Sequence, residues 1–129
     1  MIKVSAKELL SWIDDAYSIG GDKNSLYLLL DLIGGISREE LYSVRIDSSK
    51  DIYLKENLNK INSYWLEFNN ESKPIQYICG QSYWRDFKFK VSRDVLIPRK
   101  ETEQIVDIAL DICGDKNKIL FADLGTGSG

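Results

Sequence analysis

The amino-acid sequence predicts an α+β chain: first a helical bundle, then a β-hairpin, then the beginning of an open α/β domain. Three observations support this order. Apolar residues recur at helical spacing over much of residues 5–69, and they alternate with lysines over residues 87–91. A short apolar run before a glycine-rich turn ends the sequence. With 129 residues, 43% of them apolar, the chain is long and apolar enough to form packed cores.

The composition excludes several classes of function. The chain has no His, which rules out a Ser-His-Asp triad and a His-bearing zinc site, and we expect no metal. No apolar run approaches the ~20 residues of a membrane span, so we expect no membrane contact. A net charge of −3 and a pI near 5.0 argue against a nucleic-acid-binding module, and no nucleic-acid site is evident.

The two cysteines, Cys79 and Cys113, lie far apart in the sequence. Such sparse cysteine usage is typical of a reducing cytosol, so we expect a cytoplasmic protein. Buried, unreactive thiols are the simpler interpretation of the pair. A disulfide between them is the alternative.

Capping residues and glycines divide the first part of the chain into helices. Residues 5–8 (Ser-Ala-Lys-Glu) form a capping box that begins a helix ending at the two glycines 20–21. The nearly continuous apolar run 25–33 predicts a central, buried helix that ends at Gly34. A second capping box, residues 37–40 (Ser-Arg-Glu-Glu), begins a short third helix.

A longer helix is predicted from Asp51 to about Asn69. Its apolar stripe recurs at spacings of three and four residues: Leu54, Leu58, Ile61, Trp65 and Phe68. The aromatic residues of this stripe are typical of core packing. Residues 69–74 are polar and end in proline, so we expect the helical domain to occupy residues 1–73.

The character of the sequence changes after Pro74. Residues 75–79 predict one helical turn, and strands at 87–91 and 95–97 predict a β-hairpin within a linker, residues 74–98. Helical spacing returns over residues 101–113. The short apolar run 119–122 predicts a buried parallel strand, residues 119–124, of a second domain that begins at residue 99.

Basic residues are concentrated in the predicted hairpin region. Residues 85–100 contain six Lys and Arg residues but only two Asp residues. One interpretation is a basic hairpin that meets an acidic or RNA-bearing partner. The other is a solvated strand face.

The last seven residues, 123–129, read Asp-Leu-Gly-Thr-Gly-Ser-Gly and follow the predicted strand. In open α/β sheets, ligands bind at the carboxyl ends of strands. Glycines there allow tight dihedral angles and a close approach of the ligand to the backbone. The spacing matches the dinucleotide pattern G-x-G-x-x-G only in part, so more than one cofactor remains open.

Four segments together resemble the HemK-type protein-(glutamine-N5) methyltransferases. They are residues 74–80 (Pro-Ile-Gln-Tyr-Ile-Cys-Gly), 87–91 (Phe-Lys-Phe-Lys-Val), 95–103 (Val-Leu-Ile-Pro-Arg-Lys-Glu-Thr-Glu) and 123–129. The resemblance implies an N-terminal helical bundle, a hairpin linker and a class I, Rossmann-like methyltransferase domain. This chain departs from the family at Lys100, where proline is usual.

The resemblance also implies a function. The cofactor would be S-adenosyl-L-methionine, and the methyl group would go to the glutamine amide of the Gly-Gly-Gln motif in peptide chain release factors. The helical bundle would recognise this protein substrate, and we expect a monomer. The implied cofactor-binding residues are Asp123, Gly125, Thr126, Gly127, Ser128 and Gly129. Arg99, Thr102 and Glu103 would border the pocket, although Arg99 could instead pair with Glu103 on the helix surface.

The family's substrate motif, Asn-Pro-Pro-Tyr, is absent from this sequence, so no catalytic residue is assigned. We therefore expect an N-terminal fragment of the enzyme that is inactive alone. Two alternatives stay open. One is a non-catalytic module that binds release factors, and the other is the start of a nicotinamide-dinucleotide-binding Rossmann domain.

Overall fold

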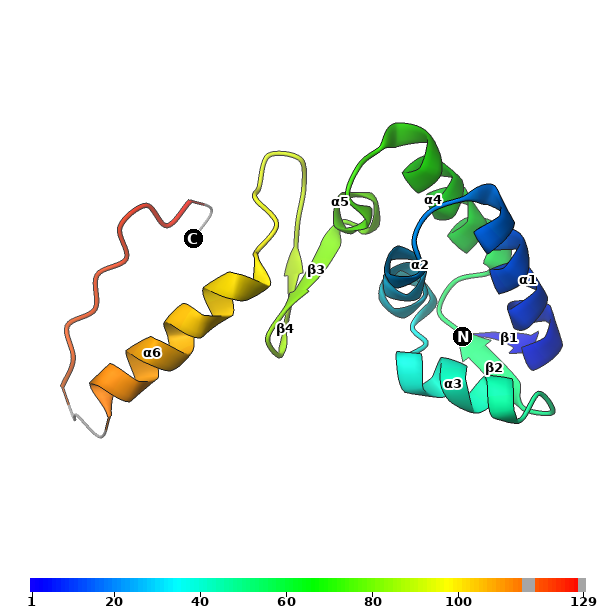
Figure 1. The fold of residues 1–129 in the computed structure, drawn as a ribbon, viewed down its shortest axis with the longest axis horizontal. Helices are drawn as coiled ribbons and strands as arrows, with labels where there is room; N and C mark the ends of the chain where they lie inside the picture. The colour runs from blue at the N-terminus through cyan, green and yellow to red at the C-terminus, as the bar shows by residue number, and fades with distance from the viewer. Residues whose placement is uncertain (115–117, 128–129) are drawn as a thin grey trace. The chain divides into compact units, whose positions relative to one another are not determined.

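A computed structural model describes residues 1–114 and 118–127 (Figure 1). The contacts between residues divide the chain into two compact units, Met1–Cys79 and Gly80–Gly129. Each unit combines helices with one two-stranded sheet, so the fold is α+β as predicted. The Rossmann-like start of a second domain remains a prediction. In the described part of the chain, no helix is long and apolar enough to cross a membrane.

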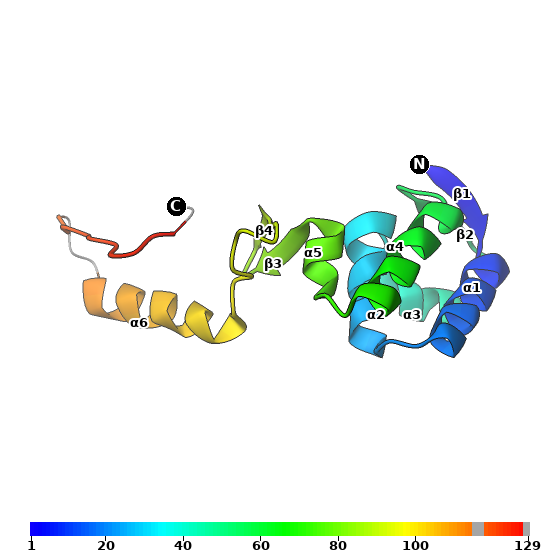
Figure 2. The ribbon, with the colours of Figure 1, turned by 90° about the horizontal axis from the view of Figure 1, so that it is seen from above.

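The first unit is mainly helical (Figures 1 and 2). Its elements are β1 (Ile2–Ser5), α1 (Ala6–Ile19), α2 (Lys23–Leu29), the π-helical turn η1 (Leu30–Gly34), α3 (Arg38–Ile46), β2 (Asp51–Leu54), α4 (Leu58–Glu71) and α5 (Ile75–Cys79). Helix α4 contacts both α1 and α2. The core therefore lies between these three helices.

The predicted helix starts are confirmed by hydrogen bonds. The Ser5 hydroxyl accepts from the Glu8 amide at 3.2 Å, and Ser37 forms the full capping box with Glu40. Gly35, with a φ of 70°, caps the C-terminal end of η1 in the left-handed region. Capping residues and glycines therefore set these boundaries.

Asp22, the N-cap of α2, carries a testable prediction about stability. Its carboxylate accepts from the Ser25 hydroxyl and from the Ser25 and Asn24 amides, and these hydrogen bonds hold its pKa below the ordinary value of 3.8. Asp22→Ala should lower the free energy of unfolding by about 1 kcal/mol at pH 7. Because the folded-state pKa is depressed, this stability is present above pH 3.8 and is lost as pH falls below it.

Urea unfolding of wild type and variant at pH 7 and pH 3 would measure this contribution. The matched control is Asp14→Ala, since Asp14 is an exposed residue within α1. The free energy of unfolding should differ less between wild type and Asp22→Ala at pH 3 than at pH 7. An equal difference at the two pH values would contradict the capping role of the carboxylate.

Trp65 is the largest fully buried side chain of the first unit. Its indole N–H donates to the Ala16 carbonyl at 2.9 Å, and its ring stacks on Phe68 with centroids 5.1 Å apart. The predicted core roles of both aromatics are confirmed. Ile75 and Cys79 belong to the same core, so residues 75–79, assigned to the linker from the sequence, pack with the helical unit.

Cys79 is buried, and desolvation raises the pKa of its thiol to about 12. Cys113 is partly exposed, and both cysteines are free. At pH 8 only roughly one Cys79 in ten thousand would be a thiolate, the reactive form. We expect a thiol reagent such as 5,5′-dithiobis(2-nitrobenzoate) to modify one cysteine quickly in the native protein and the second only after unfolding. Peptide mapping that finds Cys79 modified first would contradict this.

The predicted helix from Asp51 is wrong at its beginning. Residues 51–54 form β2, which pairs antiparallel with β1 so that Ile2 lies opposite Leu54. Ile52 and Leu54 are buried, whereas Asp51 and Tyr53 are exposed. This period-two pattern is that of a half-buried strand. The helix itself begins after Asn57, whose side chain accepts from the Lys60 amide at 2.8 Å.

The second unit contains β3 (Gln81–Trp84), β4 (Phe87–Lys90), the 3-10 turn η2 (Lys100–Thr102) and α6 (Glu103–Cys113). The predicted hairpin pairs differently: β4 pairs with β3 before it, and residues 95–97 form no strand. The two-residue turn between β3 and β4 favours this pairing. Pro98 has no backbone N–H, so it cannot donate a hydrogen bond to a neighbouring strand.

The predicted strand at residues 119–124 is also not formed. Leu120 and Phe121 are 100% and 76% exposed. A strand needs a neighbour for its backbone hydrogen bonds, and the described residues offer none there. The predicted helix at 101–113 is present as η2 followed by α6.

Candidate functional site

The glycine-rich segment at the end of the chain is open. Residues 118–127 contain neither helix nor strand, and Asp123 and Thr126 are exposed. Gly125 and Gly127 have φ angles of 80° and 64°, in the left-handed region that favours glycine. A Cβ at either position would have no atom within 4 Å. Both glycines therefore have backbone conformations that a side chain would disfavour, and each has open space around it. Ser128 and Gly129 lie outside the described residues.

A mostly apolar cavity of about 340 Å³ lies in the same unit. It is lined by Trp84, Phe89, Leu96, Pro98, Arg99 and Thr102. The Trp84 indole N–H donates to the Arg99 carbonyl at 3.3 Å, and the Thr102 amide donates to the same carbonyl at 3.1 Å. Strand β3 and η2 thus converge on one carbonyl. Such a cavity can hold a flat apolar group.

Glu103 has a different environment from Arg99 and Thr102. Its carboxylate accepts from the Arg85 amide at 3.2 Å, and its carbonyl accepts from the Arg85 guanidinium at 3.1 Å. The same guanidinium pairs with Asp107 at 2.8 Å. Arg85 therefore fastens the hairpin turn to the first turns of α6. Over residues 1–114 and 118–127, no ion pair joins Arg99 to Glu103.

The structure brings only some of the predicted residues together. Arg99 and Thr102 share a cavity, whereas Glu103 is not among its lining residues. In the described part of the chain, no hydrogen bond or ion pair connects Asp123 or the glycines to these three residues. Sequence reasoning did not identify Trp84 and Phe89 as cavity-lining residues. The alternation of aromatic and polar residues through the hairpin was the available signal.

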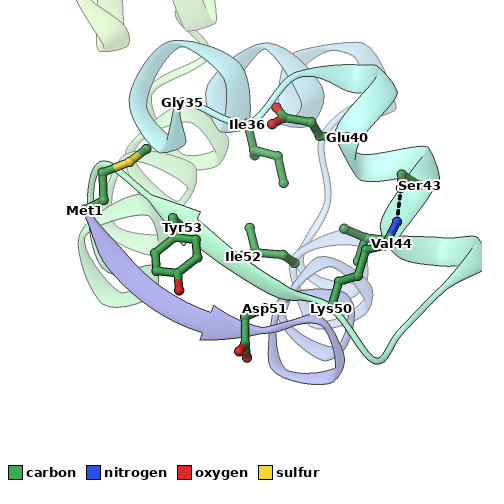
Figure 3. A pocket seen from close by; sticks show the side chains of 10 residues that line it. All are labelled: Met1, Gly35, Ile36, Glu40, Ser43, Val44, Lys50, Asp51, Ile52 and Tyr53. Atoms are coloured by element: carbon green, nitrogen blue, oxygen red, sulfur yellow. Dashed lines mark hydrogen bonds between the residues drawn. The ribbon is translucent and has the colours of Figure 1, made fainter.

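The first unit has a cavity of its own, of about 400 Å³, between β2 and α3 (Figure 3). Ile36, Val44 and Ile52 supply its apolar surface. Four of its polar side chains, those of Glu40, Ser43, Lys50 and Asp51, already have partners. Glu40 completes the capping box, Lys50 Nζ donates to Ser43 Oγ at 3.2 Å, and Asp51 pairs with Lys3 at 2.7 Å (a pairing that raises the pKa of Lys3). These four side chains thus contribute to a helix cap, a hydrogen bond and an ion pair of the fold.

Within residues 1–114 and 118–127, no three Cys, Asp or Glu side chains gather as metal ligands would. The glycine segment and the Arg99–Thr102 cavity, both in the second unit, are thus the two candidate elements of a ligand site.

Comparisons with known proteins identify relatives of the chain, although no family model matches it. A Prochlorococcus marinus protein is 39% identical over 127 residues, covering 97% of this chain and 43% of the relative. A Bacillus subtilis protein is 32% identical over 127 residues, covering 95% and 42%. A Gloeobacter violaceus protein is 33% identical over 108 residues, covering 84% and 36%.

All three relatives carry the name release factor glutamine methyltransferase. This confirms the resemblance drawn from the four motif segments. The chain spans about two-fifths of the length of these relatives.

Proposed function

We propose that this chain, homologous over nearly its whole length to release factor glutamine methyltransferases, is part of an enzyme of that activity. The enzyme would transfer a methyl group from S-adenosyl-L-methionine to the glutamine amide nitrogen of the Gly-Gly-Gln motif in a release factor. The observation that carries the proposal is the 39% identity over 127 residues. That similarity reaches across both units.

The glycine segment is proposed to hold the cofactor. Gly125 and Gly127 already occupy left-handed conformations with open space around them, which supports a close approach of ligand to backbone. The free N–H groups of such a loop would meet the cofactor's carboxylate, and the Asp123 carboxylate would accept from its amine. S-adenosylmethionine supplies an electrophilic methyl group on a sulfonium. Thr126, Ser128 and Gly129 complete the proposed segment.

Arg99 and Thr102 are proposed to border the cofactor pocket, because they line an apolar cavity in the same unit. Glu103 contributes indirectly by holding Arg85 and thereby the hairpin. The helical first unit is proposed to bind the release factor.

The acceptor amide is a poor nucleophile, because its lone pair is delocalised into the carbonyl. It must be oriented toward the methyl group by acceptors for its hydrogens. The Asn-Pro-Pro-Tyr motif implied for this task is absent from the sequence, and no residue is assigned in its place. We therefore expect the 129-residue chain alone to transfer no methyl group. A release-factor-binding role without catalysis is the second candidate for the isolated chain.

A methyl-transfer assay on the complete gene product that contains this chain would test the proposal. We expect transfer of tritiated methyl from S-adenosylmethionine to a purified release factor, and none to a release factor with Gln→Ala in its Gly-Gly-Gln motif. Methyl transfer that is indifferent to this glutamine would refute the substrate assignment. Binding of a nicotinamide dinucleotide in preference to S-adenosylmethionine would favour the Rossmann alternative.

A further inference from the structure

The hairpin of the second unit separates its side chains by face. All four residues of β4 are exposed. Because side chains alternate along a strand, Phe87 and Phe89 lie on one face, and Lys88 and Lys90 on the other. In the register of the pair, Lys88 lies opposite Tyr83 and Lys90 opposite Gln81. These four residues, Gln81, Tyr83, Lys88 and Lys90, form what we term the lysine face.

The opposite face has an apolar role within the unit. The Phe87 and Phe89 rings stack with centroids 6.0 Å apart, and the Phe89 ring lies 6.2 Å from Trp84. Trp84 and Phe89 line the apolar cavity with Leu96 and Pro98. Trp84 and Phe89 of the aromatic face thus line a cavity, whereas Phe87 stays 60% exposed. The lysine face is the polar surface of the hairpin.

The lysine face borders a cavity, and among the described residues its two lysines form no ion pair. A cavity of about 460 Å³ is lined by Gln81, Lys88 and Lys90, together with the adjoining residues Gly80, Phe89 and Val91. The Lys88 ammonium lies 4.8 Å from the Tyr83 ring centroid, which holds it over the strand pair. Arg85 is paired with Asp107, whereas among the described residues neither Lys88 nor Lys90 forms an ion pair.

The spacing of the two lysine charges matches that of carboxylates on an extended peptide. Two residues apart on a strand, Lys88 and Lys90 are separated by about 7 Å. Carboxylates at alternate positions of an extended peptide have the same separation. Duplex nucleic acid is a poorer match, because two lysines would neutralise only two phosphates of a long, regular array.

We propose that the lysine face docks an extended acidic segment of the release factor, so that the hairpin takes part in binding the protein substrate. This inference rests on the proposed function. It assigns to the hairpin a binding role separate from the cofactor loop and from the helical unit.

Steady-state kinetics of the complete gene product would test the role of the two lysines. The double variant Lys88→Glu/Lys90→Glu replaces two attractions by two repulsions. It should raise KM for the release factor about tenfold at low salt, with kcat and the KM for S-adenosylmethionine unchanged. At about 1 M salt, where the Debye length is about 3 Å, most of the difference should vanish. The matched control, Lys88→Arg/Lys90→Arg, keeps the charge and should behave as wild type.

Each other outcome is decisive. An unchanged KM in the Glu double variant overturns the docking role, and so does a tenfold rise in the Arg control. Loss of kcat at unchanged KM would show a structural effect instead. If wild type binds a labelled single-stranded RNA and the Glu variant loses only that binding, the face serves nucleic acid and the inference is wrong. Failure of wild type to methylate any release factor defeats the proposed function itself.

Discussion

Replacing Trp65 by alanine should lower the free energy of unfolding of the first unit by about 3–5 kcal/mol. The Trp65 side chain is 0% exposed, so its removal leaves a large cavity between α1, α2 and α4. Its indole N–H also satisfies the Ala16 carbonyl, which would lose a buried hydrogen bond. A loss of this size approaches the total stability of many small domains, so much of the protein would be unfolded at 37 °C.

Urea unfolding followed by far-ultraviolet circular dichroism would measure this effect. Trp84→Ala is the matched control, because Trp84 lies in the second unit and is partly exposed. Trp84→Ala also removes a tryptophan side chain, but it should leave the urea unfolding transition of the first unit unchanged. A Trp65→Ala protein whose midpoint equals that of wild type would show that the core of the first unit does not depend on this residue.

Replacing both Gly125 and Gly127 by alanine should weaken S-adenosylmethionine binding to the complete gene product by about a hundredfold or more. Each position has a φ in the left-handed region, where a residue with a Cβ costs roughly 1–2 kcal/mol. The two Cβ atoms would also occupy the space in which we propose that the cofactor binds. Isothermal titration calorimetry with S-adenosylmethionine would measure the dissociation constant.

Gly114 supplies a control for backbone strain alone. Its φ is 49°, and an added Cβ there would likewise meet no atom within 4 Å. Gly114→Ala should cost similar stability and leave cofactor affinity close to that of wild type. Equal loss of affinity in Gly114→Ala and in the double variant would mean that strain, rather than a role in binding, explains the result.

Local signals predicted most of the helical unit correctly. Ser5 and Ser37 act as caps, and Trp65 lies in the core, because capping and periodicity depend on residues close in sequence. The strand at 51–54 was mistaken for helix, because Leu54 also fits the helical stripe of α4. Its partner is β1, about fifty residues earlier, and no local sequence pattern predicts that pairing.

The errors in the second unit have the same origin. The hairpin was assigned to the wrong pair of strands, because Val95 and its neighbours have strand-like composition but no partner. The apolar run at 119–124 was expected to be a strand, and strand formation depends on neighbours that the described residues do not include. The lining of the Arg99–Thr102 cavity by Trp84 and Phe89 depends on tertiary packing, which spacing alone does not encode.

The pairing of β1 with β2 has a consequence for how the protein is made. Val4 lies opposite Ile52, so the first strand leaves the ribosome 48 residues before its partner. At roughly 5–20 residues per second, this interval lasts about 2–10 s. During that time β1 at the nascent N-terminus has no partner strand, and α1 lacks its contact with Trp65. The first unit can therefore close only late in its own synthesis, once residue 65 has emerged.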